Sequence, residues 1–160
     1  MPGVWAQGDF ATRTAHGGIV IHGRSDTTLN PGGVRIGTAE IYRQVAHVAQ
    51  VLESLAFGEQ VDNDVRVVLL VRLAEGVVLS DELEAAIRRQ VREGCTPRHV
   101  PALIVAVDDL PRTRSGKLVE LAVADVVNGR EVRNTSALAN PEALGEIADA
   151  VARAEAASGT

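Results

Sequence analysis

The sequence predicts a small α+β domain in which helices flank a short central sheet. The first observation is a β-branched, apolar run at 65–73, which is typical of a buried strand. The second is a mixed run at 51–61, separated from the first by Asp-Asn-Asp at 62–64, so that the two runs predict a hairpin. The third is the alternation of such runs with segments whose apolar residues recur at helical spacing.

The additional strands are expected to be short. Glycines enclose an apolar run at 18–23, which predicts a buried strand. Asn-Pro-Gly-Gly at 30–33 demands an unusual backbone path, and a short strand is expected after it at 34–36. A last apolar strand is expected at 102–107.

Four helices are expected, over residues 38–48, 80–94, 118–127 and 141–157. Thr38 is the expected N-cap of the first helix. Ser80 is the expected N-cap of the second, which has an acidic first turn and ends near Gly94.

The apolar positions of the later helices predict which side faces the core. Leu118, Leu121 and Val126 are expected to face inward in the third helix, with Ala122 and Val123 as further candidates. Asn-Pro-Glu at 140–142 supplies a cap, a first-turn proline and an acidic residue, and so predicts the start of the fourth, alanine-rich helix.

Composition excludes several classes of function. The formal net charge of −5, with only one Trp, one Tyr and two Phe, disfavours binding to nucleic acid or to an anionic membrane. No apolar run is long enough to cross a membrane. The single cysteine, Cys95, excludes an internal disulfide, and the histidines lack metal-ligand spacing, so we expect no metal site and a cytoplasmic location.

The most informative stretch is Leu-Pro-Arg-Thr-Arg-Ser-Gly-Lys at 110–117. It places three cations, a rigid proline and a glycine directly before a helical run, which indicates a loop that delivers positive charge to an anionic ligand. Lys117 is the candidate for stabilising charge on a phosphate or carboxylate oxygen. A solvated basic loop with no ligand explains the same pattern. Gly32-Gly33 followed by Arg35 is a second, weaker anion candidate.

Several stretches in order resemble the C-terminal part of the adenylate-forming acyl-CoA synthetases. They are Gly-Asp at 8–9, Gly-Arg-Ser-Asp at 23–26, Gly-Val-Arg-Ile-Gly-Thr-Ala-Glu-Ile at 33–41 and Pro-Arg-Thr-Arg-Ser-Gly-Lys at 111–117. Within that superfamily, the sequence at 28–42 and the sequence at 134–144 resemble the acetoacetyl-CoA synthetases.

The resemblance implies a nucleotide site at the N-terminal end of the chain. Asp9 would hold the ribose hydroxyls of ATP, and Arg24 would lie at its ribose and phosphate edge. Asp26 would be the hinge, and Arg35 would reach a nucleotide phosphate or a neighbouring backbone. Ordinary charged turns and an exposed strand arginine are the alternatives. Ala6-Gln7 departs from the aromatic and arginine that many relatives carry before this aspartate.

The remaining implied residues serve catalysis and CoA binding. Lys117 would assist adenylation of the acid, and its acylation would neutralise the charge that this step needs. Gly33 would line the pantetheine tunnel. Arg92 would meet the 3′-phosphate of CoA, although an arginine on a helix surface is more often simply solvated. The implied cosubstrates are ATP, with Mg²⁺ in the full-length enzyme, and CoA.

Residues 1–16 show no sustained periodicity, and we expect residues 1–23 to be the trailing segment of a large N-terminal domain. Residues 24–26 would be the hinge, 27–129 the lid domain and 130–160 a C-terminal extension. The glycine- and hydroxyl-rich phosphate loop and the acid pocket of such enzymes are absent from the sequence, so the chain alone is expected to be inactive. The expected partner is the N-terminal domain. The alternative function is an interaction module whose Lys117 is the substrate of a protein lysine acetyltransferase.

Overall fold

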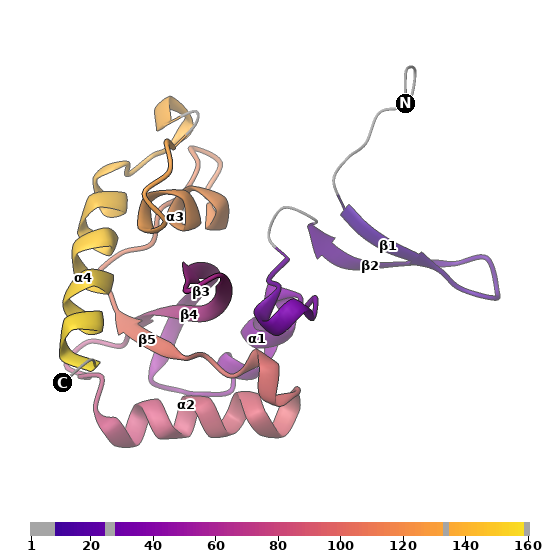
Figure 1. Ribbon diagram of the computed structural model, residues 1–160, viewed down its shortest axis with the longest axis horizontal. Helices are drawn as coiled ribbons and strands as arrows, with labels where there is room; N and C mark the ends of the chain where they lie inside the picture. The colour runs from indigo at the N-terminus through magenta and orange to yellow at the C-terminus, as the bar shows by residue number, and fades with distance from the viewer. Residues whose placement is uncertain (1–8, 25–27, 133–134, 159–160) are drawn as a thin grey trace.

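The computed structural model describes residues 9–24, 28–132 and 135–158. Its central sheet has the strand order β3-β4-β5, with β3 and β4 antiparallel and β4 and β5 parallel. The strands are β3 (Val51–Val61), β4 (Asp64–Leu73) and β5 (Leu103–Ala106). The four helices are α1 (Thr38–Val45), α2 (Asp81–Gly94), α3 (Glu120–Val127) and α4 (Glu142–Ser158). The predicted α+β class is therefore confirmed (Figure 1).

The β3–β4 turn follows from its two central residues. Asp62 and Asn63 have φ values of 49° and 65°, which are backbone angles that Asp and Asn tolerate better than most residues. Two consecutive positive φ values match the right-handed twist of a hairpin. The predicted hairpin is confirmed, and its register aligns Val61 with Asp64.

The sheet has an apolar core on each face because its side chains alternate in direction. One core, under α3 and α4, contains Leu55, Phe57, Leu70 and Val105 among its buried residues. The other core lies under α1 and α2 and takes the intervening positions, including Leu69. Helices therefore cover both faces of the central strands (Figure 1).

Helix α2 is the element that the sequence predicts best. The Ser80 hydroxyl accepts a hydrogen bond from the Leu83 amide at 3.3 Å, as expected of an N-cap. Leu83, Ile87 and Val91 are buried along one face. Because β4 and β5 are parallel, α2 provides the crossover between them.

A separate hairpin of β1 (Asp9–Arg13) and β2 (Ile19–Arg24) lies apart from the central sheet (Figure 1). The strand expected at 18–23 is present, but the sequence did not predict β1, because its residues show no regular alternation. The expected burial of this strand is wrong at Ile19 and Val20, which are 71% and 46% exposed.

The expected strand at 34–36 is wrong. Pro31–Gly33 forms a 3₁₀ turn, and only Ile36 pairs, through an isolated bridge to Leu29. The two amide-to-carbonyl distances of this bridge are both 3.0 Å. The glycines therefore fold the chain back on itself before α1, and the loop does not extend the sheet.

Two helix predictions also need correction. Gly37 takes the N-cap position of α1, and the Thr38 hydroxyl donates to Glu120 at 3.2 Å. Helix α1 ends at Val45, three residues before the expected end at 48. In α3 the buried residues are Ala122 and Val123, whereas Leu121 is 45% exposed.

The other expected inward positions are confirmed, since Leu118 and Val126 pack against the core that contains Ala122 and Val123. Leu118 bridges Arg112 and so lies before the helix, which begins at Glu120. The helix therefore begins two residues later than the expected start at 118. Within the described residues, no helix is both long and apolar enough to cross a membrane.

Helix α4 is expected to stabilise the domain because it closes one of the two cores. Ile147 is 1% exposed, and its replacement by alanine should lower the free energy of unfolding by about 2–5 kcal/mol. Urea denaturation measures this loss. Glu146→Ala, at an exposed site one residue earlier, is the control and should change stability by less than about 0.5 kcal/mol. Equal effects of the two substitutions would contradict the packing of α4.

Candidate functional site

The lysine loop, residues 111–117, connects β5 to α3 and is closed by hydrogen bonds within itself. The Thr113 amide donates to the Lys117 carbonyl at 2.8 Å, and the Lys117 amide donates to the Thr113 hydroxyl at 3.1 Å. Gly116 has a φ of +82°, an angle that glycine adopts without steric cost, and its amide donates to the Thr113 carbonyl at 2.8 Å. These contacts fix the backbone from which Lys117 projects.

The Lys117 side chain is exposed and has no hydrogen-bond or ion-pair partner among the described residues. A lysine ammonium on a flexible stem can reach an anionic oxygen of a ligand. The loop is therefore ordered at its base and free to bind at its tip, which is the arrangement expected of a charge-delivering loop.

Arg112 fastens the lysine loop to the central sheet. Its guanidinium donates to the Gly116 carbonyl at 3.2 Å and also contacts the Glu53 carboxylate on β3. Glu53 accepts a second hydrogen bond, at 2.8 Å, from Arg72 on β4. Partial burial by itself would raise the pKa of the Glu53 carboxyl, but the hydrogen bonds and charges of Arg112 and Arg72 outweigh it and lower that pKa.

The glycine loop around the 3₁₀ turn Pro31–Gly33 is the second candidate site. Gly33 is exposed with a φ of +76°, and a Cβ atom built on it would meet no atom within 4 Å. Gly32 has a φ of +55°, and its Cβ would lie 2.5 Å from Nη1 of Arg98. The Gly32 amide donates to Asp64 at 2.9 Å, which anchors the loop to the start of β4.

The two loops precede helices that are joined by hydrogen bonds. Glu120, the first residue of α3, accepts from the Thr38 hydroxyl at 3.2 Å and from the Tyr42 hydroxyl, both on α1. The Tyr42 oxygen also accepts from the Ala56 amide of β3 at 2.9 Å. Burial first, and then the Glu120 carboxylate, raise the pKa of the Tyr42 phenol, so it stays a neutral donor.

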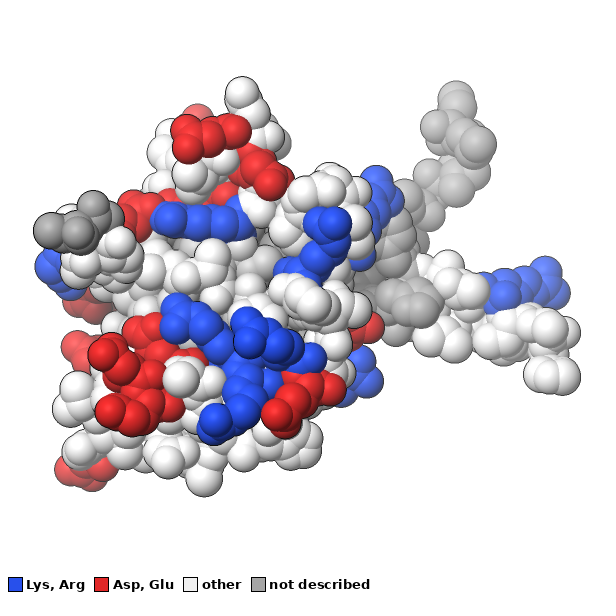
Figure 2. Space-filling model, turned by 60° about the horizontal axis from the view of Figure 1, so that its bottom comes forward, with Lys and Arg blue, Asp and Glu red and all other residues white. Residues whose placement is uncertain are grey.

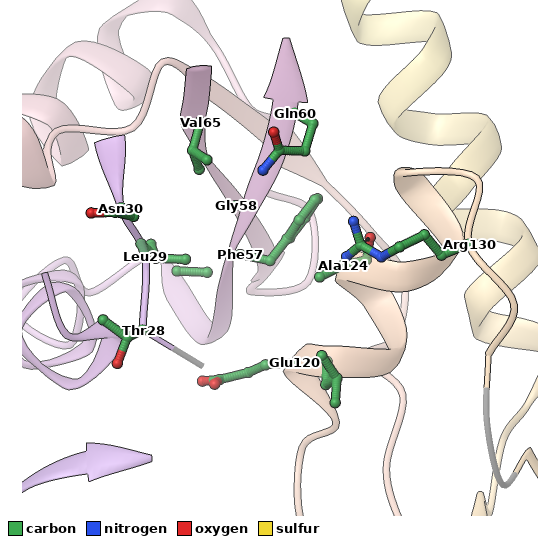
Figure 3. A pocket seen from close by; sticks show the side chains of 12 residues that line it. Thr28, Leu29, Asn30, Phe57, Gly58, Gln60, Val65, Glu120, Ala124 and Arg130 are labelled. Carbon is green, nitrogen blue, oxygen red and sulfur yellow. Dashed lines mark hydrogen bonds between the residues drawn. The ribbon is translucent and has the colours of Figure 1, made fainter. Parts of the chain in front are cut away.

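A pocket of about 280 Å³ opens between β3, α3 and the segment before the glycine loop. Figure 3 shows Glu120 and Arg130 at the helix side of this pocket and Asn30 at the loop side. Phe57 and Leu29 supply apolar lining. The pocket adjoins the Glu120 contacts that link α1 to α3.

The remaining predicted site residues lie on other elements. Arg92 is exposed in the last turn of α2. Figure 2 shows basic and acidic side chains in adjacent groups on the face that it brings forward. Arg35 is exposed beside the glycine loop. Asp9 and Arg24 are paired across the β1–β2 hairpin. The structure thus brings this one predicted pair together, while Asp26 lies outside the described residues.

A comparison with protein families matches residues 40–117 to the AMP-binding enzyme C-terminal domain. The chain carries an AMP-binding enzyme C-terminal domain. This finding and the relatives described next confirm the family resemblance of the ordered motifs. The individual roles of the site residues stay predictions.

Relatives with this domain include two acetoacetyl-CoA synthetases. The chain is 65% identical over 141 residues to acetoacetyl-coenzyme A synthetase of Rhizobium meliloti (strain 1021), covering 88% of this chain and 22% of the relative. It is 46% identical over 144 residues to acetoacetyl-CoA synthetase of Caenorhabditis elegans, covering 88% of this chain and 20% of the relative. The chain thus spans about a fifth of the length of these curated relatives.

A solved structure supports the same relationship. Acetoacetyl-CoA synthetase from Streptomyces lividans superposes with a TM-score of 0.80 at 38% identity, covering 92% of this chain and 22% of that chain. The C-terminal domain of an adenylate-forming enzyme therefore accounts for the arrangement of the sheet, the helices and the two loops.

The sequence did not predict Glu53 as a site residue. The ion pairs of Glu53 with Arg112 and Arg72 can be tested by measuring stability as a function of pH. Its pKa is lower in the folded state than in the unfolded state, so its stabilisation is fully present above the unfolded value of about 4.3 and is lost as pH falls through the folded value. Glu53→Gln should therefore lower the free energy of unfolding by about 1 kcal/mol at pH 7.

The difference between Glu53→Gln and the unmodified protein should be constant between pH 7 and about 5 and shrink at lower pH. Urea denaturation across this range measures it, with exposed Glu75→Gln as the control. A difference that grows on acidification would contradict the ion-paired Glu53.

Proposed function

We propose that the chain is the mobile lid of an AMP-forming acid–CoA ligase of the acetoacetyl-CoA synthetase type. The full-length enzyme would convert acetoacetate, ATP and CoA to acetoacetyl-CoA, AMP and diphosphate. The names of the relatives and the 65% identity to one of them support this substrate. Residues 27–129 would form the lid, residues 24–26 its hinge and residues 130–160 an extension of it, while residues 1–23 would trail from the N-terminal domain.

The observation that carries the proposal is the exposed ammonium of Lys117 on a hydrogen-bonded loop. In the first half-reaction, the carboxylate oxygen of the acid attacks the α-phosphate of ATP and diphosphate leaves. Two anions repel one another as they meet, and a cation that contacts both lowers the repulsion and orients the attack. Lys117 would supply this cation.

The second half-reaction would use the glycine loop. After diphosphate leaves, rotation about Asp26 would present Gly33 to the active site, where the CoA thiol attacks the acyl-adenylate and releases AMP. The open space around the missing Cβ of Gly33 supports a passage for the pantetheine arm. The exposed Arg92 would contact the 3′-phosphate of CoA.

ATP would be held jointly by this chain and the N-terminal domain. Asp9 would bind the ribose hydroxyls, with Arg24 beside the ribose and phosphates and Arg35 toward a phosphate. Among residues 9–24, 28–132 and 135–158, no group of three or more His, Cys, Asp or Glu residues could hold a metal ion. In the full-length enzyme, Mg²⁺ would accompany ATP.

Lys117→Ala should lower the adenylation rate of the full-length enzyme by about 10²–10³-fold, because it removes a charge that stabilises the transition state. Acetoacetate-dependent exchange of diphosphate into ATP measures this step. Thioester formation from preformed acetoacetyl-adenylate should change far less, since that step does not require Lys117.

Arg114→Ala is the matched control, because Arg114 is another exposed cation of the same loop. Equal losses in the two variants would indicate a general effect of loop charge and contradict the role of Lys117. Purified chain without the N-terminal domain should show no exchange, and exchange by the chain alone would contradict its function as a lid.

The exposure of Lys117 also supports a second function, as the substrate of a protein lysine acetyltransferase. Acetylation would neutralise the ammonium and so inactivate adenylation. Incubation with such an enzyme and acetyl-CoA, followed by mass spectrometry, should place the label on Lys117. Absence of label on Lys117, the single lysine of the chain, would contradict this function, and Lys117→Arg serves as the unlabelled control.

A further inference from the structure

The C-terminal extension, residues 130–160, forms backbone hydrogen bonds with the lysine loop. The Arg114 amide donates to the Ala137 carbonyl at 3.1 Å, and the Ala139 amide donates to the Arg112 carbonyl at 2.8 Å. An isolated antiparallel bridge joins Thr113 to Leu138. The extension therefore forms a short strand-like edge along the loop that carries Lys117.

Asn140 completes this edge with its side chain. Its Oδ1 accepts a hydrogen bond from the Arg112 amide at 2.9 Å, while its Nδ2 donates to the Leu110 carbonyl at 3.0 Å and to Oδ2 of Asp109 at 2.7 Å. One planar amide thus binds three groups in the segment that enters the lysine loop. The sequence predicted Asn140 as the N-cap of α4, but its side-chain oxygen is directed to Arg112.

The extension can hold the loop because it is itself part of the core. Leu138 is 8% exposed, and Leu144 and Ile147 of α4 are buried in the same cluster as Leu110. Displacing Asn140 would therefore require movement of packed apolar side chains. All of these extension residues lie beyond residues 40–117, the range of the family match.

We propose that Asn140 is a positioning residue that sets the placement of the lysine loop for adenylation. The inference rests on the proposed function of Lys117. Lys117 lies five residues after Arg112 in the sequence. The hydrogen bonds inside the loop fix the backbone of Lys117 relative to Arg112. A misplacement of about 1 Å in a catalytic group can cost about 10²-fold in rate.

The test is Asn140→Ala in the full-length enzyme. Adenylation, measured by acetoacetate-dependent diphosphate exchange, should fall about 10–100-fold, while the KM for ATP and thioester formation from preformed acetoacetyl-adenylate change little. Hydrogen exchange of the Arg112 and Arg114 amides should accelerate, because both amides depend on the extension.

The matched control is Asn128→Ala. Asn128 also accepts one hydrogen bond and donates two: from the Gln60 amide at 2.7 Å, and to the Gly58 and Ala124 carbonyls at 3.0 and 2.6 Å. It joins α3 to β3 and lies outside both the lysine loop and the glycine loop. An equal loss of adenylation in Asn128→Ala would show that any lost amide network has this effect and would overturn the inference.

Exchanging the amide and the carboxylate between positions 140 and 109 tests their contact directly. Asn140→Asp alone keeps an acceptor for the Arg112 amide but places a second carboxylate against Asp109, so adenylation should fall. Adding Asp109→Asn restores a donor and an acceptor across this contact, while the Leu110 carbonyl stays without its donor, so adenylation should rise above that of Asn140→Asp but stay below that of the unmodified enzyme. Adenylation no higher in the double variant than in Asn140→Asp would overturn the role of the contact between Asn140 and Asp109.

Lys117→Ala is measured beside these variants to separate two failures. Normal adenylation in Lys117→Ala would contradict the proposed function itself. Normal adenylation in Asn140→Ala beside an impaired Lys117→Ala, or unchanged exchange of the Arg112 and Arg114 amides, would overturn only the positioning role.

Discussion

The double-sided burial of β4 is the constraint on which the structure depends. Val68 and Leu70 point into the core beneath α3 and α4, while Val67 and Leu69 point into the core beneath α1 and α2. A single strand therefore fixes all four helices relative to one another. The lysine loop and the glycine loop inherit their positions from these helices, because each loop leads directly into one of them.

Polar contacts refine the placement that the cores establish. Glu120 connects the helix after the lysine loop to Thr38 and Tyr42 on the helix after the glycine loop. Glu53 and Arg112 tie the lysine loop to the sheet. Because these contacts join separate elements, they link the positions of the two loops to one another.

The sequence predicted elements with strong periodicity and failed where tertiary pairing decides the backbone. The strand at 65–73 and the helix capped by Ser80 can be predicted from their local sequence patterns. Strand β1 cannot, because its residues do not alternate between apolar and polar. The exposed loop around Lys117 could be predicted because a glycine and neighbouring cations mark it in the sequence. Glu53 and Asn140 could not, since they reach Arg112 across 59 and 28 positions of sequence.

The hydrogen bonds of the lysine loop bear on whether acylation of Lys117 can be reversed. Its shape depends on backbone groups and on Arg112, and the Lys117 ammonium contributes no contact to it within the described residues. Capping that nitrogen with an acyl group would therefore change the local charge without melting the turn. Removal of the cap would return the cation to an intact scaffold, with no refolding step to delay recovery.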